Sequence, residues 1–210
     1  MHAADAGTRV LTTRLILASA NRDKLRELQV LLAPLGFDLI LQSVLGIDSA
    51  AETGTTFEAN ALLKARHAAG VGALPALADD SGLEVEALGG RPGVYSARYA
   101  GPAASDVDNN ALLLAELAAV PRAARRARYR CVLALVRFAQ DRAPLIARGS
   151  WEGAIALHTT GRGGFGYDPL FIPEGLNVSA AELPPAEKNA VSHRAQALAD
   201  LIAQLQRRPL

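Results

Sequence analysis

Apolar and polar residues follow two different spacings along this chain, and these predict strands interspersed with helices. Short apolar runs predict strands at 14–19, 37–41 and 75–78, and longer runs predict two strands that could pair, at 128–138 and 145–157. Residues 83–88 alternate apolar and acidic side chains, as an exposed strand does. Apolar residues three and four apart predict helices over 21–33, 56–72, 106–120 and 184–206. Because both kinds of element occur from end to end, the predicted class is α/β or mixed α+β with a mixed sheet.

The chain shows no change of composition that would mark a linker. We therefore expect a single domain over residues 14–210, preceded by a disordered lead-in over residues 1–13. The lead-in lacks the apolar core and cleavage pattern of a secretory signal. No apolar run reaches the roughly 20 residues that span a bilayer. Together with the unpaired Cys131, these features favour the cytoplasm and argue against a membrane partner.

Charge changes this picture in one respect. The 210 residues include 22 Lys and Arg against 21 Asp and Glu, a net charge of +1. Such a balance disfavours a nucleic-acid partner held by counterion release, and the arginines over 122–130 are interpreted as a solvated linker. A small anion is still allowed, because a site can be locally basic in a neutral protein.

Polar clusters follow several of the predicted elements, where loops carry function. Residues 19–24 join the first strand to a helix, whose N-terminus favours phosphate oxygens; a simple Asn21 cap is the alternative. Glu52 could bind a metal, and Asn60 and Lys64 follow it four apart on one helix face. The alternative there is a capped helix with a surface lysine.

Asp79 and Asp80 come directly after an apolar run. Two adjacent carboxylates suit a hard cation such as Mg²⁺, and one could be the general base toward a metal-bound water. The alternative is an Asx-turn closed by Gly82. Farther along, the glycines of 161–169 surround Phe165, whose ring could stack on a base. A flexible hairpin loop is the other interpretation of that segment.

Lys188, His193 and Arg194 bring three potentially cationic groups into two turns. A solvated basic face is one interpretation, but such crowding opposes a helix unless an anion binds there. Taken together, the clusters supply phosphate donors, metal-binding carboxylates, a stacking aromatic ring and a basic clamp. These are the parts of a nucleoside triphosphate site.

The quoted segments also resemble a known family. Residues 78–88 (ADDSGLEVEAL) and 92–101 (PGVYSARYAG) resemble the central motif of the non-canonical purine nucleoside triphosphate pyrophosphatases. Residues 19–24, 52–64, 164–169 and 188–194 are similar to the other motifs of that family, in order and at the expected intervals. The resemblance extends over 14–205 and therefore leaves out the lead-in.

This resemblance implies hydrolysis of inosine, deoxyinosine and xanthosine triphosphates (ITP, dITP, XTP) to the monophosphate and pyrophosphate, which removes deaminated purines from the nucleotide pool. It implies an elongated central mixed sheet flanked by helices, with two lobes around a substrate cleft, and a homodimer. Asp80 would be the general base and a Mg²⁺ ligand, with Glu52 as a second ligand. The family commonly has Glu where Ala59 stands here.

The resemblance also implies a set of substrate-binding residues, in which Phe165 would stack on the purine and the last three would recognise the base or the phosphates. They are Ser19, Ala20, Asn21, Arg22, Asp23, Lys24, Ser81, Phe165, Gly166, Tyr167, Asp168, Lys188, His193 and Arg194.

Phosphoanhydride hydrolysis requires charge neutralisation and an aligned nucleophile. We expect water to attack the α-phosphorus with Asp80 as its base, because Cys131 lies within a strand pattern and Ser81 lacks the G-x-S-x-G elbow. Two alternatives stay open: a related pyrophosphatase that acts on modified pyrimidine nucleotides, and a nucleotide-binding sensor without turnover.

Overall fold

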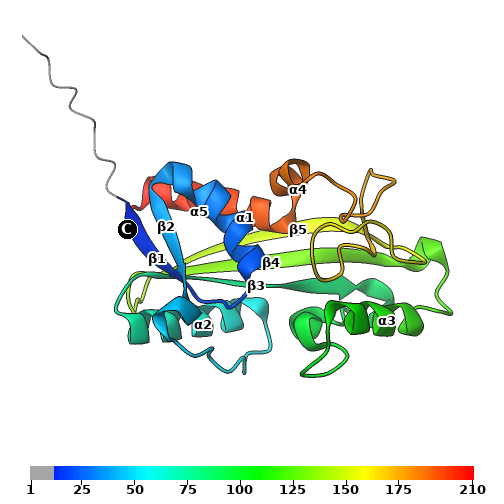
Figure 1. Cartoon of the computed structure of the whole chain (residues 1–210), viewed down its shortest axis with the longest axis horizontal. Coiled ribbons are helices and arrows are strands. Elements are labelled where there is room, and N and C mark those ends of the chain that lie inside the picture. Colours follow the sequence, from blue (N-terminus) through cyan, green and yellow to red (C-terminus); the bar gives the residue numbers. More distant parts are fainter. Residues whose placement is uncertain (1–11) are drawn as a thin grey trace, which may run out of the picture.

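The computed structural model describes residues 12–210, and this part of the chain forms a six-stranded mixed sheet that runs the length of the molecule (Figure 1). The strand order is β2-β1-β3-β4-β5-β6. β1 pairs in parallel with β2 on one side and with β3 on the other. The pairs β3–β4, β4–β5 and β5–β6 are antiparallel. The strands are β1 (Thr13–Leu17), β2 (Phe37–Leu41), β3 (Ala76–Val85), β4 (Arg126–Val136), β5 (Leu145–Ile155) and β6 (Phe171–Pro173).

Helices cover both faces of this sheet. In Figure 1, α1, α4 and α5 lie on one side of the long strands and α2 on the other, whereas Leu113 and Leu117 of α3 pack in one cluster with Leu83 and Val85 of β3. Leucines of α1 and α5 pack with β1 and β4 in one core cluster, and the alanines of α2 pack against the opposite face. The helices are α1 (Arg22–Leu32), α2 (Phe57–Gly72), α3 (Asp106–Glu116), α4 (Pro185–Val191) and α5 (His193–Arg207).

The unequal strand lengths create the two lobes. β1 pairs with β3 at Ile16–Ala76 and Leu17–Leu77, and then ends, while β3 continues to Val85. One lobe holds β1, β2, α1 and α2. The other contains α3, the 3-10 helix η4 (Gly93–Arg98) and the long loops around β6 (Figure 1). Beside β3 the end of β1 leaves an open edge, and in open α/β sheets ligands bind at such carboxyl ends of strands. The predicted fold class and the two lobes are confirmed.

Some predicted elements are wrong in detail. Residues 75–78 and 83–88 do not form separate strands, because Asp79 to Gly82 continue one strand, pairing residue by residue with Leu133 to Arg130 of β4. Leu83 and Val85 are fully buried, so this half of β3 is not an exposed strand. The predicted last helix is two helices, because Ser192 leaves the helical conformation and caps α5 through its hydroxyl group.

The interpretation of 122–130 as a solvated linker is only partly correct, because Arg122, Arg126 and Arg128 are exposed but the segment is not a linker. Residues 126–130 belong to β4, and Arg125 is buried, donating hydrogen bonds to the carbonyl oxygens of Leu117, Val120 and Ala156. Arg125 therefore joins the segment that follows α3 to the end of β5.

The predicted lead-in, residues 1–13, lies outside the described residues except for Thr12 and Thr13, and Thr13 already begins β1. Among the helices described over 12–210, none combines the length and the hydropathy that a membrane crossing requires.

Candidate active site

The turn from β1 into α1 forms one wall of the cleft. Asn21 caps α1, and its side-chain oxygen accepts hydrogen bonds from the backbone N–H groups of Asp23 (2.8 Å) and Lys24 (3.1 Å). The Ser19 hydroxyl accepts from the Asn21 N–H at 3.0 Å. The predicted Asn cap is thus confirmed, and a phosphate at this helix end would meet N–H groups that Asn21 already occupies.

Asp79 and Asp80 point to opposite faces of β3, because neighbouring side chains of a strand alternate. Asp79 faces α1 and α5, where Lys24 Nζ (2.5 Å) and Arg194 Nε (2.7 Å) donate to its carboxylate. Asp80 faces α2, where Lys64 Nζ donates to Oδ1 at 2.5 Å. The prediction that the adjacent pair holds one cation is therefore wrong, although Asp80 alone remains a candidate ligand.

Glu52 joins Asp80 on that second face. Both carboxylates accept from Lys64 Nζ, Glu52 Oε1 at 3.1 Å, and the other Glu52 oxygen accepts from Arg98 Nη1 of η4 at 2.6 Å. Asp80 Oδ2 is buried and has no hydrogen-bond partner within residues 12–210. The tertiary structure thus places the two predicted metal ligands around one ammonium group.

Opposing effects set the protonation of these groups. Burial raises the pKa of Asp80 above its usual value, even though the Lys64 ammonium works in the opposite direction. Burial would also raise the pKa of Glu52, but Lys64 and Arg98 outweigh it and the pKa is lowered. The pKa of Lys64 is raised, because its carboxylate neighbours outweigh burial. Of the two carboxylates, Asp80 is the better proton acceptor.

A cavity of about 130 Å³ lies on the Asp79 face, between α1, the loop before β6 and α5. It is smaller than the roughly 300 Å³ at the lower end of small-molecule sites, so it fits part of a nucleotide. The predicted residues that line it are Asn21, Lys24, Ser81, Phe165, Gly166, Tyr167, Asp168, Lys188, His193 and Arg194.

Phe165 forms one surface of this cavity beside two buried cations. Lys188 Nζ lies 5.0 Å and the Arg194 guanidinium carbon 5.5 Å from the centre of its ring. Cations within about 6 Å of an aromatic face are attracted to it. Lys188 and Arg194 are 5% and 2% exposed, so the interpretation as a solvated basic face is wrong.

Asp168 organises this wall of the cavity. Its carboxylate accepts from Lys188 Nζ (2.6 Å), the Phe165 N–H (2.9 Å) and the Tyr129 hydroxyl (3.3 Å). The Tyr167 side chain is buried, and its hydroxyl donates to the Ser96 carbonyl at 2.8 Å. These two predicted substrate residues therefore hold the loop in place, and Phe165 is the one whose ring faces the cations.

His193 is a neutral member of the site. Its ring stacks on Tyr129 with centroids 4.6 Å apart and an 8° angle between planes. Burial, with the nearby Arg194 charge, lowers the pKa of His193 well below its usual value. The expectation of a third cation is therefore wrong at neutral pH. Nδ1 is buried and has no hydrogen-bond partner within the described residues.

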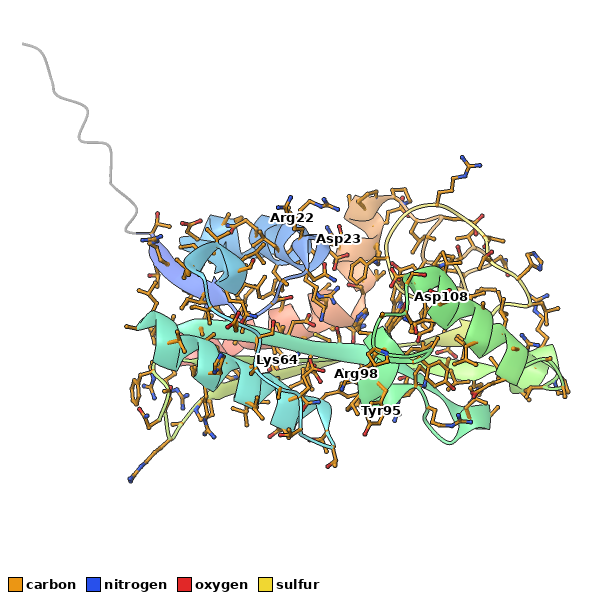
Figure 2. All side chains as sticks on the ribbon, turned by 60° about the horizontal axis from the view of Figure 1, so that its bottom comes forward. Arg22, Asp23, Lys64, Tyr95, Arg98 and Asp108 are labelled. Atoms are coloured by element: carbon orange, nitrogen blue, oxygen red, sulfur yellow. The ribbon has the colours of Figure 1, made fainter. Side chains whose placement is uncertain are left out.

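Four predicted substrate residues do not line the cavity. Ser19 supports the turn, Ala20 and Arg22 are exposed, and Asp23 pairs with Arg26. Figure 2 shows Arg22 and Asp23 on α1 on one side of β3, with Lys64 and Arg98 on the other side.

Comparison with known proteins assigns the family. A profile of the Ham1 family matches residues 15–204. The chain belongs to the Ham1 family. It is 58% identical over 192 residues to a dITP/XTP pyrophosphatase of Methylococcus capsulatus, across 91% of this chain and 96% of the relative. It is 55% identical over 185 residues to a dITP/XTP pyrophosphatase of Pectobacterium atrosepticum, across 88% and 94%.

Solved Ham1 structures share the fold. A HAM1 protein from Coxiella burnetii matches with a TM-score of 0.86 and 47% identity, over 93% of this chain and 100% of that one. A nucleoside-triphosphatase, dITP/XTP pyrophosphatase, from Mycobacterium abscessus matches with a TM-score of 0.73 and 42% identity, over 92% and 100%.

This Ham1 chain contains one central residue that the sequence interpretation missed. Glu27 of α1 accepts from Lys188 Nζ at 3.3 Å and from Arg194 Nη1, and so joins α1 to α4 and α5. Its position one turn after Lys24 was the available signal, because residues three apart share a helix face. A solvated glutamate shows the same spacing, so the signal was weak.

The charges around Asp79 predict a pH dependence of the Ham1 fold. Burial alone would raise the pKa of Asp79, but Arg194 and Lys24 hold it well below its usual value. A depressed carboxyl pKa stabilises the fold above the unfolded-state pKa of about 3.9, and this stabilisation is lost as pH falls. We expect the free energy of unfolding, measured with urea between about pH 5 and 3, to fall less steeply in Asp79→Asn than in the wild type. Asp38→Asn, at an exposed site, should keep the wild-type slope. Equal slopes in all three proteins would contradict the prediction.

Proposed function

We propose that this Ham1 family member hydrolyses the non-canonical purine nucleoside triphosphates ITP, dITP and XTP to the monophosphate and pyrophosphate. The main support is one arrangement across β3: an aromatic ring beside two buried cations on one face, and two convergent carboxylates on the other. The first suits a base and its phosphates, and the second suits the hydrolytic reaction. The names of the relatives agree with this substrate class.

The carboxylate pair fits Mg²⁺. Asp80 has a buried oxygen without a partner in the described residues, and Glu52 shares its ammonium neighbour. Mg²⁺ is usually held by one or two carboxylates together with substrate phosphates and waters. Ala59 stands where the family commonly has a glutamate, so Asp80 and Glu52 would hold the ion without that carboxylate. When bound, it would neutralise charge on the phosphate oxygens.

The residues of the chain divide the remaining work. Asp80 orients a water toward the α-phosphorus and accepts its proton, for which its raised pKa is suitable. Lys24 lies at the open edge of β3, where its ammonium can exchange Asp79 for a phosphate oxygen. Lys188, on the Asp168 wall of the cavity, offsets the negative charge that develops on the pyrophosphate leaving group.

Selectivity for a 6-keto purine follows from a buried donor. A donor opposite position 6 pairs with the oxygen of hypoxanthine or xanthine and is left facing the amino group of adenine. Unpaired polar groups of this kind can give discrimination of about 10⁴. The neutral His193, whose Nδ1 is free within the described residues, and the Arg194 guanidinium are the candidate donors.

A panel of triphosphates tests this proposal. ITP, dITP and XTP are compared with GTP, ATP and modified pyrimidine triphosphates in the presence of Mg²⁺, and both pyrophosphate and monophosphate are quantified. We expect pyrophosphate from the first three. Preference for modified pyrimidines would indicate the alternative enzyme, and binding without turnover would indicate a sensor.

We also propose that the enzyme is cytoplasmic, since its substrates belong to the nucleotide pool, and that it forms a homodimer. Beyond α2 the same sheet face is exposed and carries both signs of charge, with Arg126, Arg128 and Glu152. A two-fold contact there would place arginines against glutamates. Sedimentation at low micromolar concentration should give the mass of two chains, and the mass of one would contradict the dimer.

A further inference from the structure

Gly166 lies in the loop before β6 and is held by α3, a helix of the same lobe, through both of its backbone groups. Its N–H donates to Asp106 Oδ2 at 2.7 Å, and its carbonyl oxygen accepts from Asn110 Nδ2 at 2.8 Å. The same Asn110 nitrogen donates to the Asp106 carbonyl, also at 2.8 Å. Two side chains one turn apart on α3 therefore grip a single residue of the loop before β6.

This grip is next to the aromatic residue of the cavity. Gly166 has a φ of +63°, a conformation that other residues rarely adopt, so the backbone direction after Phe165 depends on it. Both backbone groups of Phe165 bond to Asp168: its N–H donates to the carboxylate at 2.9 Å, and its carbonyl oxygen accepts from the Asp168 N–H at 3.3 Å. The two bonds at Gly166 add an anchor on α3 directly after Phe165, and so restrain the backbone that carries the ring.

The grip is separate from the N-terminal cap of α3. Ser105 and Asp108 form a complete capping box at the start of this helix, which satisfies its first N–H groups. Asp106 is thus not needed as a cap and reaches outward to the loop, and its side chain lines the cavity beside Phe165. Asn110 is 6% exposed, so its donor is committed inside the protein.

We infer that Asp106 and Asn110 are positioning residues for the purine base: they hold the Gly166 peptide so that the Phe165 ring is in place before the nucleotide arrives. The inference rests on the proposed function, because it gives the ring a base to stack on. A preformed surface lowers the ordering cost of binding. The triphosphate binds at Lys24 and the β3 edge, so its contribution to affinity does not depend on the preformed position of the ring.

Three substitutions separate this role from a general structural one. Asp106→Ala removes the acceptor for the Gly166 N–H, whereas Asp106→Asn keeps an oxygen that can accept it. Asn110→Asp replaces the donor to the Gly166 carbonyl with a carboxylate that cannot donate. Asp108→Ala is the control, because it damages the cap of the same helix without touching Gly166 (Figure 2 shows Asp108 on α3).

The test compares two ligands by calorimetry. One is the α,β-methylene analogue of ITP, which carries the base, and the other is inorganic tripolyphosphate, which does not. We expect Asp106→Ala and Asn110→Asp to weaken the analogue about 10-fold, the order of a lost base–aromatic stack, while tripolyphosphate stays within about 2-fold of the wild type. KM for ITP should rise more than kcat falls. Asp106→Asn should bind both ligands as the wild type does, and Asp108→Ala should lower Tm with an unchanged affinity ratio.

The ratio of the two dissociation constants is the deciding quantity, because partial unfolding removes binding of both ligands equally. An unchanged ratio in both Asp106→Ala and Asn110→Asp would overturn the inference, as would an Asp106→Asn protein as weak as Asp106→Ala. Failure of the proposed function is a different result, namely wild-type protein that releases no pyrophosphate from ITP.

Discussion

Asp80→Asn protein should bind ITP nearly as the wild type does, while kcat falls by about 10²–10⁴-fold, the usual range for the loss of a general base. The amide has the shape of the carboxylate but cannot accept the proton of the attacking water. Binding persists because Phe165 and Arg194 lie on the other face of β3 from Asp80. Pyrophosphate release gives kcat, and equilibrium titration with ITP gives the affinity.

Glu52→Gln is the matched comparison, because Glu52 shares the Lys64 ammonium but is not the proposed base. A lost metal ligand weakens metal binding, so raising the Mg²⁺ concentration should restore much of the activity of Glu52→Gln and little of that of Asp80→Asn. Near-wild-type hydrolysis by Asp80→Asn would contradict the assignment of Asp80 as the general base. Recovery of both variants at high Mg²⁺ would reduce Asp80 to a metal ligand.

Of the proposed variants, Arg194→Met should lose the most stability. We expect its free energy of unfolding to fall by about 3–5 kcal/mol, the range for breaking a buried ion pair. The Arg194 side chain is 2% exposed and donates to Asp79, whose side chain is fully buried. It also pairs with Glu27 of α1. Removing the cation leaves Asp79 with Lys24 alone as a charged partner among the described residues. Urea unfolding at pH 7 measures the loss.

Two comparisons sharpen this result. Asp79→Asn/Arg194→Met should lose less than the sum of its single variants, because the charge left unpaired in Arg194→Met is absent. Arg148→Met removes an exposed pair with Glu58 and should cost below about 1 kcal/mol. A loss from Arg194→Met as small as that from Arg148→Met would show that the buried network contributes little.

Much of the fold follows from local sequence. Apolar spacing predicted β2 at its observed bounds and the long β4–β5 pair, and Asn21 was correctly predicted to begin α1. These features depend on side-chain periodicity and on bonds between near neighbours, which the linear chain already contains. The order of the motifs was also sufficient to indicate the family, because motif spacing is a property of the sequence.

Local signals failed where a distant strand decided the outcome. Asp79 to Gly82 contain turn-forming residues, yet pairing with β4 extends β3 through them. Asp79 and Asp80 are neighbours in the sequence, but the extended strand sends their carboxylates to opposite faces of the sheet. β6 has three residues and pairs with β5 alone, too short for any periodicity to show.

The sequence by itself determined which chemical groups the protein has: carboxylates, lysines, an aromatic ring and glycines in a fixed order. Tertiary structure decided which of them meet and in what charge state. Burial beside Arg194 makes His193 neutral, and a shared ammonium brings Glu52 to Asp80. The Asp106–Asn110 grip on Gly166 joins residues 56 or more positions apart. Such contacts depend on packing and on the local dielectric, which act between segments distant along the chain.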